Sequence, residues 1–192
     1  VAHEFNNILT TILNNAKLGL KCDDLEANRR TFEKILNSAR RASKITTGVL
    51  ALSRNRSARM ERMEIIPLVE EVLAVLEKDL SKHQVRLERD FRDQACAEVI
   101  GPQIEQVLMN LIINARQAMA HGGTLVVGVR TNAAAGMVEI SVKDSGSGIE
   151  PDKLNKIFEP FFTTKEGPDQ SGQGGSGLGL SICREIIERH HG

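Results

Sequence analysis

The sequence of 192 residues contains no tryptophan or tyrosine, and aromatic residues make up only 3% of it. Its 25 basic residues are balanced by 25 acidic ones, so the formal net charge is zero. A nucleic-acid-binding surface depends on a basic excess, and single-strand binders also use exposed rings that stack on bases. The composition therefore argues against a nucleic-acid partner.

Long apolar runs and paired cysteines are also missing. No apolar stretch approaches the roughly 20 residues that a membrane-spanning helix needs, and no signal peptide is present. The cysteines, Cys22, Cys96 and Cys183, lie far apart and form neither a disulfide framework nor a zinc motif. We therefore expect a cytoplasmic segment without membrane contact of its own. Because the sequence begins at Val1 rather than Met and ends in mid-pattern at Gly192, we expect a fragment.

Residues 1–56 carry two helical patterns. Apolar residues recur at three- and four-residue steps from Phe5 to Leu20 and again from Phe32 to Leu52, with a polar break at 22–24. This spacing predicts a helical hairpin with a wide apolar face on each helix. One hairpin cannot bury both faces, so we expect two copies to pair as a four-helix bundle in a homodimer.

Residues 57–63 are charged and poor in aliphatic side chains, which predicts a linker. The remaining residues, 64–192, alternate between helical and strand patterns. Helices are predicted at 67–83, 102–121 and 178–190, and strands at 85–91, 124–131 and 137–144. The chain therefore reads as two domains, α then α+β. A sheet of three strands would leave an open edge that is prone to aggregation.

Two asparagines, Asn110 and Asn114, stand four residues apart in the predicted helix 102–121. Their amides therefore project from the same helix face. Mg²⁺ takes oxygen ligands and usually keeps several waters alongside substrate phosphates, so one amide oxygen is a sufficient protein ligand. By itself this pair also fits an ordinary polar helix surface.

Two glycine-rich segments follow. DSGSGI, from Asp144 to Ile149, comes directly after a strand, where glycines allow a tight turn beside a ligand. GGSGLGL opens the last predicted helix, where backbone amides favour phosphate oxygens. Neither segment has the spacing of a P-loop or of a dinucleotide fingerprint. Between them, Phe158, Phe161 and Phe162 form an apolar anchor, and the polar stretch 165–175 has the composition of a mobile lid.

Four segments, taken in order, resemble motifs of the histidine-kinase ATP-binding domain. Asn110 and Asn114 resemble its N box, and DSGSGI resembles its first glycine box. FEPFFTTK resembles its F box, and GSGLGL resembles its second glycine box. That domain is similar to the ATPases of gyrase B and the Hsp chaperones. The start of the chain, VAHEFNNIL, resembles the phosphoacceptor box of the same kinases. The resemblance implies a helical hairpin followed by a Bergerat-type α/β sandwich, here without its last two strands.

The resemblance also implies roles for individual residues. His3 would accept the γ-phosphoryl group of ATP, Glu4 would orient the His3 ring, and Asn7 would align water for dephosphorylation of a partner aspartate. Asn114 would hold Mg²⁺. The nucleotide-binding residues would be Asn110, Asn114, Asp144, Gly146, Gly148, Ile149, Phe158, Thr164, Lys165, Gly175, Gly177, Leu178 and Gly179. Among them, Asp144 would read the adenine amine and Gly146 and Gly148 would let the ring approach.

Asn110 separates this chain from hydrolytic relatives. Those ATPases resemble one another in having a glutamate one turn before the magnesium ligand, and an amide cannot accept the proton from water as that glutamate does. In many related kinases a basic residue stands where this chain has Gln117. With Asn110 in place of a glutamate, the resemblance implies histidine autophosphorylation and transfer to a response-regulator receiver domain, in the cytosolic part of a sensor that is anchored elsewhere.

Two other functions stay open at this point. The chain could be a nucleotide-dependent interaction module whose His3 is never phosphorylated. It could also be a serine kinase or anti-sigma factor of the same superfamily, although the hairpin containing His3 argues against that.

Overall fold

The computed structural model describes residues 2–21, 24–54, 59–164 and 177–192, and within these it describes only the backbone for 2–6, 40–41 and 43–54. The chain divides into two compact units. The first, here called the helical unit, comprises Val1–Arg56 and Glu159–Leu178. The second, the α/β unit, comprises Ser57–Phe158 and Gly179–Gly192.

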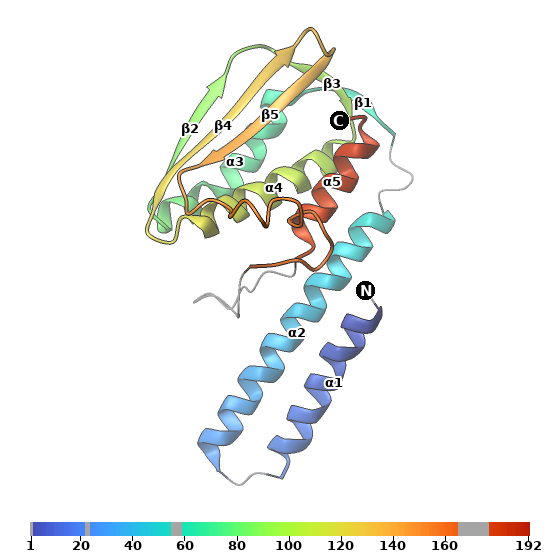
Figure 1. The fold of residues 1–192 in the computed structure, drawn as a ribbon, viewed down its shortest axis with the longest axis vertical. Coiled ribbons are helices and arrows are strands. Elements are labelled where there is room, and N and C mark those ends of the chain that lie inside the picture. Colours follow the sequence, from blue (N-terminus) through green and yellow to red (C-terminus); the bar gives the residue numbers. More distant parts are fainter. Residues whose placement is uncertain (1, 22–23, 55–58, 165–176) are drawn as a thin grey trace. The chain divides into compact units, whose positions relative to one another are not determined.

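The helical unit contains the predicted hairpin, with α1 at Ala2–Gly19 and α2 at Leu25–Arg54 lying side by side (Figure 1). Asp24 caps the start of α2, because its Oδ1 accepts a hydrogen bond from the Glu26 amide at 3.1 Å. A side-chain acceptor at this position satisfies one of the amides that a helix start leaves without an intrahelical partner. The polar break in the sequence is therefore the signal that ends one helix and begins the next.

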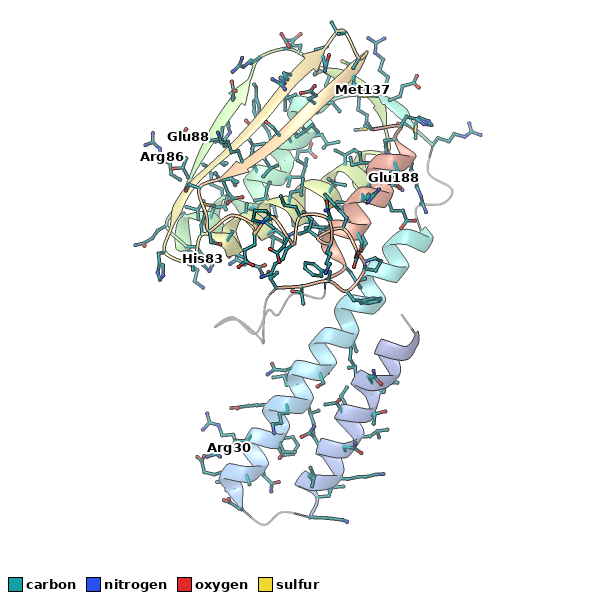
Figure 2. The ribbon with its side chains drawn as sticks, viewed as in Figure 1. Arg30, His83, Arg86, Glu88, Met137 and Glu188 are labelled. Atoms are coloured by element: carbon teal, nitrogen blue, oxygen red, sulfur yellow. The ribbon has the colours of Figure 1, made fainter. Side chains whose placement is uncertain are left out.

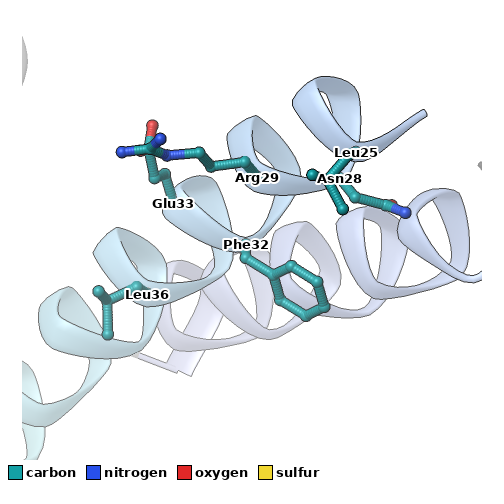
Figure 3. A pocket seen from close by; sticks show the side chains of 6 residues that line it. All are labelled: Leu25, Asn28, Arg29, Phe32, Glu33 and Leu36. Atoms are coloured by element: carbon teal, nitrogen blue, oxygen red, sulfur yellow. The ribbon is translucent and has the colours of Figure 1, made fainter.

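Much of the apolar surface of this hairpin is uncovered within one chain. Ile8 is buried, but Leu13, Phe32 and Leu36 are 58%, 65% and 51% exposed. Part of this surface is a shallow hollow of about 470 Å³ along α2 (Figure 3). Its lining residues are Leu25, Asn28, Arg29, Phe32, Glu33 and Leu36. An apolar stripe of this length needs a covering surface in water.

The α/β unit contains two sheets and three helices. Its elements are β1 (Glu61–Glu64), α3 (Ile65–Lys82), β2 (Val85–Phe91), β3 (Cys96–Val99), α4 (Gly101–Ala118), β4 (Gly123–Asn132), β5 (Met137–Asp144) and α5 (Gly179–Arg189). In the larger sheet, β4 lies in the centre, parallel to β2 and antiparallel to β5. The small second sheet pairs β1 with β3 in antiparallel orientation.

The core lies between the larger sheet and the helices α3 and α4, which cover one of its faces (Figure 1). Alternate residues of β4, Leu125, Val127 and Val129, are fully buried, as a period of two requires for one inward face. From the helices, Leu73 and Leu108 pack into the same cluster. The result is the predicted α/β sandwich, which follows the helical hairpin in the sequence.

Residues 61–63 correct the predicted linker, because they belong to β1 rather than to a connection. β1 pairs from Glu61 opposite Val99 to Glu64 opposite Cys96. Its sequence, ERME, has three charged residues and no apolar alternation. Its pairing with β3 and the packing of Met63 against the core stabilise it instead. Both are long-range contacts, which the local sequence does not reveal.

The larger sheet has β2 and β5 at its edges. The prediction of three strands holds for this sheet, but its edges are protected better than expected. On β2, Arg86, Glu88 and Asp90 are exposed and charged, and on β5 Lys143 is exposed as well. Charged side chains along an edge oppose pairing with a second chain. Within the described ranges, no helix is both long and apolar enough to cross a membrane.

Candidate functional site

The two asparagines of α4 face the beginning of α5. The Asn110 Nδ2 donates a hydrogen bond to the Gly179 carbonyl at 3.4 Å. A Cβ added to Gly179 would lie 3.8 Å from Asn110 Cγ and 3.9 Å from Asn114 Nδ2, so the backbone of α5 starts directly beside both amides. The first amides of a helix have no intrahelical partners and carry a partial positive charge. Asparagine oxygens and helix amides therefore meet at one place, which suits a phosphate with its metal.

The contact between α4 and α5 continues beyond Gly179. The buried Cys183 donates its thiol hydrogen to the Val107 carbonyl at a sulfur–oxygen distance of 3.8 Å. Burial raises the pKa of the Cys183 thiol to about 11, so the group stays protonated at neutral pH. Cys183 is thus an unreactive packing residue of the helix pair. Cys96 is exposed and also unpaired, as the scattered cysteines predict.

The first glycine-rich segment begins at the end of β5. Asp144 pairs in register with Leu125, which is fully buried, so both side chains extend from the face of the sheet that carries the helices. The Gly146 amide donates to Asp144 Oδ1 at 2.9 Å, which holds the exposed carboxylate in place. Asp144 is therefore oriented before any ligand arrives, as a residue that reads an amine requires.

The structure shows that glycine is required at position 146 by packing against α4, whereas the sequence suggested a tight turn beside a ligand. A Cβ at this position would lie 2.7 Å from the Ala118 carbonyl oxygen and 2.8 Å from Ala118 Cβ. The Ser147 amide donates to the same carbonyl at 3.2 Å. Gly146 therefore lets the loop pack against the end of α4, which the local sequence does not show. Gly148 lies in open space with φ of 71°, so it serves the turn itself.

Two further predicted residues also belong to the α/β unit. Ile149 is 50% exposed and Phe158 is 40% exposed. The Phe158 ring has the Arg184 guanidinium of α5 at 5.9 Å from its centroid, which fits a weak cation–π contact. Exposed apolar side chains near a glycine-rich turn are suited to cover the flat face of a base.

The remaining nucleotide-binding candidates do not lie in this unit. Thr164, Gly177 and Leu178 belong to the helical unit. There the Phe161 amide donates to the Gly177 carbonyl at 2.9 Å, and Gly177 has φ of 67°. Lys165 and Gly175 lie outside the described residues.

The candidate phosphoacceptor region lies in α1. The structure places the backbone of His3 and Glu4 in the first turns of this helix, and their side chains lie outside the described part. Asn7 is exposed one turn later, and its carbonyl accepts a hydrogen bond from the Thr11 hydroxyl at 2.9 Å. Residues four apart share a helix face, so Asn7 lies on the His3 face of α1.

Arg116, next to Gln117, does not substitute for the missing basic residue. It is 7% exposed, and its Nε lies 3.3 Å from Asp79 Oδ2 of α3. Its Nη1 lies 3.0 Å from His83 Nε2. Arg116 therefore joins α4 to α3, on a different face from Asn114.

The donors available for a metal fit magnesium held mainly by a nucleotide. Among the described residues, no group of three or more histidine, cysteine or acidic side chains could hold a metal ion. What the α4 face offers is the pair of half-buried amides, Asn110 and Asn114. Mg²⁺ bound chiefly by phosphates and water needs only one or two such protein ligands. The residues present therefore fit a metal that arrives with its nucleotide.

Comparison with known families matches two family models to separate parts of the chain. Residues 1–58 match the model of the His Kinase A (phospho-acceptor) domain. Residues 100–192 match the model described as histidine kinase-, DNA gyrase B-, and HSP90-like ATPase. The solved catalytic domain of histidine kinase ThkA is 32% identical, with a TM-score of 0.58 over 68% of this chain and 81% of that one.

The chain belongs to the histidine kinase family. Sensor kinase CckA of Brucella abortus is 35% identical over 100% of this chain and 21% of its own length. Sporulation kinase A of Bacillus subtilis is 33% identical over 100% of this chain and 30% of its own length. The chain thus spans less than a third of each of these kinases. The structure of ThkA in complex with the response regulator protein TrrA covers 100% of this chain and 54% of that one, at 31% identity and a TM-score of 0.72.

Replacement of Gly146 tests whether its packing on α4 matters for the candidate nucleotide site. Gly146→Ala forces a Cβ against Ala118, so the loop must move, and we expect nucleotide affinity to fall about tenfold or more. Gly136→Ala is the control, because Gly136 has φ of 64° and no atom within 4 Å of an added Cβ. It should cost about 1 kcal/mol of stability from backbone strain and leave affinity unchanged. Equal affinities of both variants in equilibrium binding of ADP would contradict the assignment.

Proposed function

We propose that this chain binds Mg·ATP in its α/β unit and transfers the γ-phosphoryl group to His3. The observation that carries the proposal is the position of the α5 N-terminus directly beside Asn110 and Asn114. Phosphoryl transfer requires mostly positioning and charge neutralisation, and this arrangement offers helix amides, amide oxygens and a place for a metal. The membership in the histidine kinase family supports the choice of reaction.

The roles of the residues follow from their chemistry. Asp144, held by the Gly146 amide, accepts a hydrogen bond from the exocyclic amine of adenine. The first amides of α5 and the Asn110 side chain hold the phosphates, and Asn114 would hold Mg²⁺, which would neutralise phosphate charge. One imidazole nitrogen of His3 forms the new P–N bond while the bond from the γ-phosphorus to the bridging oxygen breaks and ADP leaves. Glu4 accepts the N–H of the other ring nitrogen.

Asn110 explains why the acceptor is a histidine and not water. Its amide nitrogen donates to the Gly179 carbonyl, and an amide oxygen cannot take a proton from water at neutral pH. No general base therefore stands at this position of α4. Loss of ATP through hydrolysis should be slow compared with transfer to His3.

The second substrate of the proposed kinase is a response-regulator receiver domain, whose aspartate takes the phosphoryl group from His3. Support comes from the ThkA structure, which contains a response regulator protein and matches this chain along its whole length. We also propose that Asn7 aligns water against the aspartyl phosphate, which adds a phosphatase activity. Asn7 fits this role because it is exposed one turn after His3.

We further propose a homodimer formed through the helical unit, in the cytoplasm, as part of a sensor that is anchored elsewhere. The uncovered apolar stripe of Leu25, Phe32 and Leu36 supports the dimer, since these residues recur at helical spacing along the hollow of α2. A second hairpin offers the same stripe, and two such hairpins make a four-helix bundle.

Incubation with γ-labelled ATP and Mg²⁺ tests the proposed transfer. The unaltered chain should acquire label that is stable to base and lost in acid, as expected for phosphohistidine. His3→Gln should abolish this label and keep nucleotide binding, whereas His121→Gln, at an exposed position, should change neither. Label retained in His3→Gln would refute His3 as the acceptor. Nucleotide binding without label in any variant would instead support an interaction module.

The phosphatase role of Asn7 has a separate test. In Asn7→Ala we expect autophosphorylation within about twofold of the unaltered chain, while dephosphorylation of a phosphorylated receiver domain falls about tenfold or more. Asn14→Ala is the matched control, an exposed asparagine in the same helix and further from His3. Unchanged dephosphorylation in Asn7→Ala would refute this role.

The molecular mass of the chain in solution tests the proposed dimer. Phe32→Ser combined with Leu36→Ser should convert a dimer into a monomer in sedimentation equilibrium, because both changes remove apolar area from the stripe. Val75→Ser removes an apolar side chain that is 70% exposed on α3 in the α/β unit, and should leave the mass unchanged. A monomer before any substitution, or a dimer that survives the double change, would contradict this interface.

A further inference from the structure

The helix α5 packs against the rest of the α/β unit chiefly through α4 (Figure 1). Three hydrogen bonds join the two helices, and they pair Gly179 with Asn110, Cys183 with Val107, and His190 with Ile100. The partners in α4 descend in number as those in α5 ascend, so the two helices are antiparallel. One face of α5 is therefore held along its length by a single neighbouring helix.

The exposed face of α5 is charged and adds little to this attachment. Figure 2 labels Glu188 on this helix, and the Arg184 Nε donates to Glu188 Oε1 at 2.8 Å, so this ion pair lies within α5. The two side chains are 61% and 60% exposed, and exposed pairs of this kind contribute little to stability. The contact of Arg184 with the Phe158 ring, at 5.9 Å from the centroid, is also weak. The position of α5 thus depends on its contact with α4.

The apolar surface that α5 buries is small and lies apart from the main core. Its buried residues are Ile182, Cys183 and Ile186. In the described part of the chain, none of the three belongs to the cluster between the larger sheet and its helices. The helix has 11 residues, and isolated helices shorter than about 12–15 residues are marginal in water. The contact with α4 therefore keeps α5 both helical and in place.

A buried polar side chain weakens this contact. Gln103 of α4 is 3% exposed, and its Oε1 has no hydrogen-bond partner among the residues that the structure describes. Gln103 lies three residues after Ile100 and four before Val107, which both bond to α5, so it lies on the same face of α4. A buried acceptor without a donor costs free energy that a bond to water would restore. Separation of α5 from α4 would give water access to Gln103.

We propose that α5 separates from α4 as a unit while the rest of the α/β unit stays folded, and that a nucleotide binds only while the two helices are in contact. The second part rests on the proposed nucleotide site. The amide donors of that site lie on α5 and its asparagines on α4, so separation divides the site. Local opening is typical of elements with few buried apolar contacts. By thermodynamic linkage, a bound nucleotide stabilises the contact between α4 and α5.

The thiol of Cys183 reports the separation, because it is buried in the contact and reaches a reagent only when α5 leaves α4. Its reaction with a thiol-specific reagent is measured in the whole chain carrying Cys22→Ser and Cys96→Ser, at reagent concentrations to which the rate is proportional. ADP with Mg²⁺, at about 100 times its dissociation constant, should slow the reaction about 100-fold, because the reactive state does not bind it. An unchanged rate with ADP bound would overturn the coupling.

A thiol in the main core separates local from global opening. Val127 is fully buried in β4, so Val127→Cys, in a chain that also carries Cys183→Ala, should react only after global unfolding. Cys183 should react at least about tenfold faster than that thiol. Equal rates would overturn the separation of α5. If Val127→Cys does not fold, urea decides: the reaction rate of Cys183 should depend on urea less steeply than equilibrium unfolding does, and an equal slope would overturn the proposal.

Gln103→Met keeps the length of the side chain and removes the unpaired acceptor. It should slow the reaction of Cys183 about tenfold. The dissociation constant of ADP should change less than about twofold, because the two helices are already in contact most of the time. Gln94→Met, at an exposed position, is the control and should change neither quantity. A reaction of Cys183 that is equally fast with Gln103 and with Gln103→Met would refute the role of Gln103.

Equilibrium binding of ADP distinguishes failure of this proposal from failure of the proposed function. Binding of ADP that leaves Cys183 as reactive as before would overturn the coupling and keep the nucleotide site. Absence of ADP binding would refute the nucleotide site and the coupling with it. A reaction at Cys183 that is still faster than at Val127→Cys would then support only the separation of α5.

Discussion

The contact between α4 and α5 is the constraint on which the proposed nucleotide site depends. The first amides of α5 lack intrahelical partners, and this contact places them next to the two asparagine side chains of α4. Both helices supply backbone or amide dipoles and no formal charge at this place. At the proposed nucleotide site, these two helices would therefore attract a phosphate through preorganised dipoles, and a bound metal would add positive charge. Arg116 cannot supply it, because it is buried against α3.

The sheet has a second part in this arrangement. β4 lies in the centre of the larger sheet and fixes β5, and β5 delivers Asp144 to the face of the sheet that carries the helices. The loop after Asp144 returns to α4 through Gly146 and Ser147, which contact the same Ala118. The helix that carries Asn110 and Asn114 is thus bonded at its C-terminal end to the loop that carries Asp144. The residues proposed to contact the base and the phosphates are therefore joined through α4.

The sequence predicted these features unequally, for physical reasons. The strands 85–91 and 137–144 were predicted with the bounds that the structure has, because their apolar alternation is local and strong. β1 was missed because its residues are charged and its stability comes from β3, which is distant in sequence. The glycine-rich segments were found from composition. The requirement for glycine at position 146, however, comes from contact with Ala118, which lies 28 positions earlier in the sequence. The contact between the Ile100 amide at the start of α4 and His190 Nε2, at the end of α5, joins residues that are distant in the sequence, so no local pattern predicts it.

The packing of Gly146 on Ala118 has a consequence for the thermodynamics of ligand capture. A glycine-rich loop loses much conformational entropy when it is fixed, because glycine has the widest choice of backbone angles. Here the contacts of Gly146 and Ser147 with Ala118 fix the loop during folding. That entropy loss therefore lowers the folding stability of the α/β unit and does not weaken the binding of a ligand. The unit is less stable than its buried core alone would make it, and the loop that carries Asp144, the proposed adenine contact, needs no further ordering step when a ligand binds.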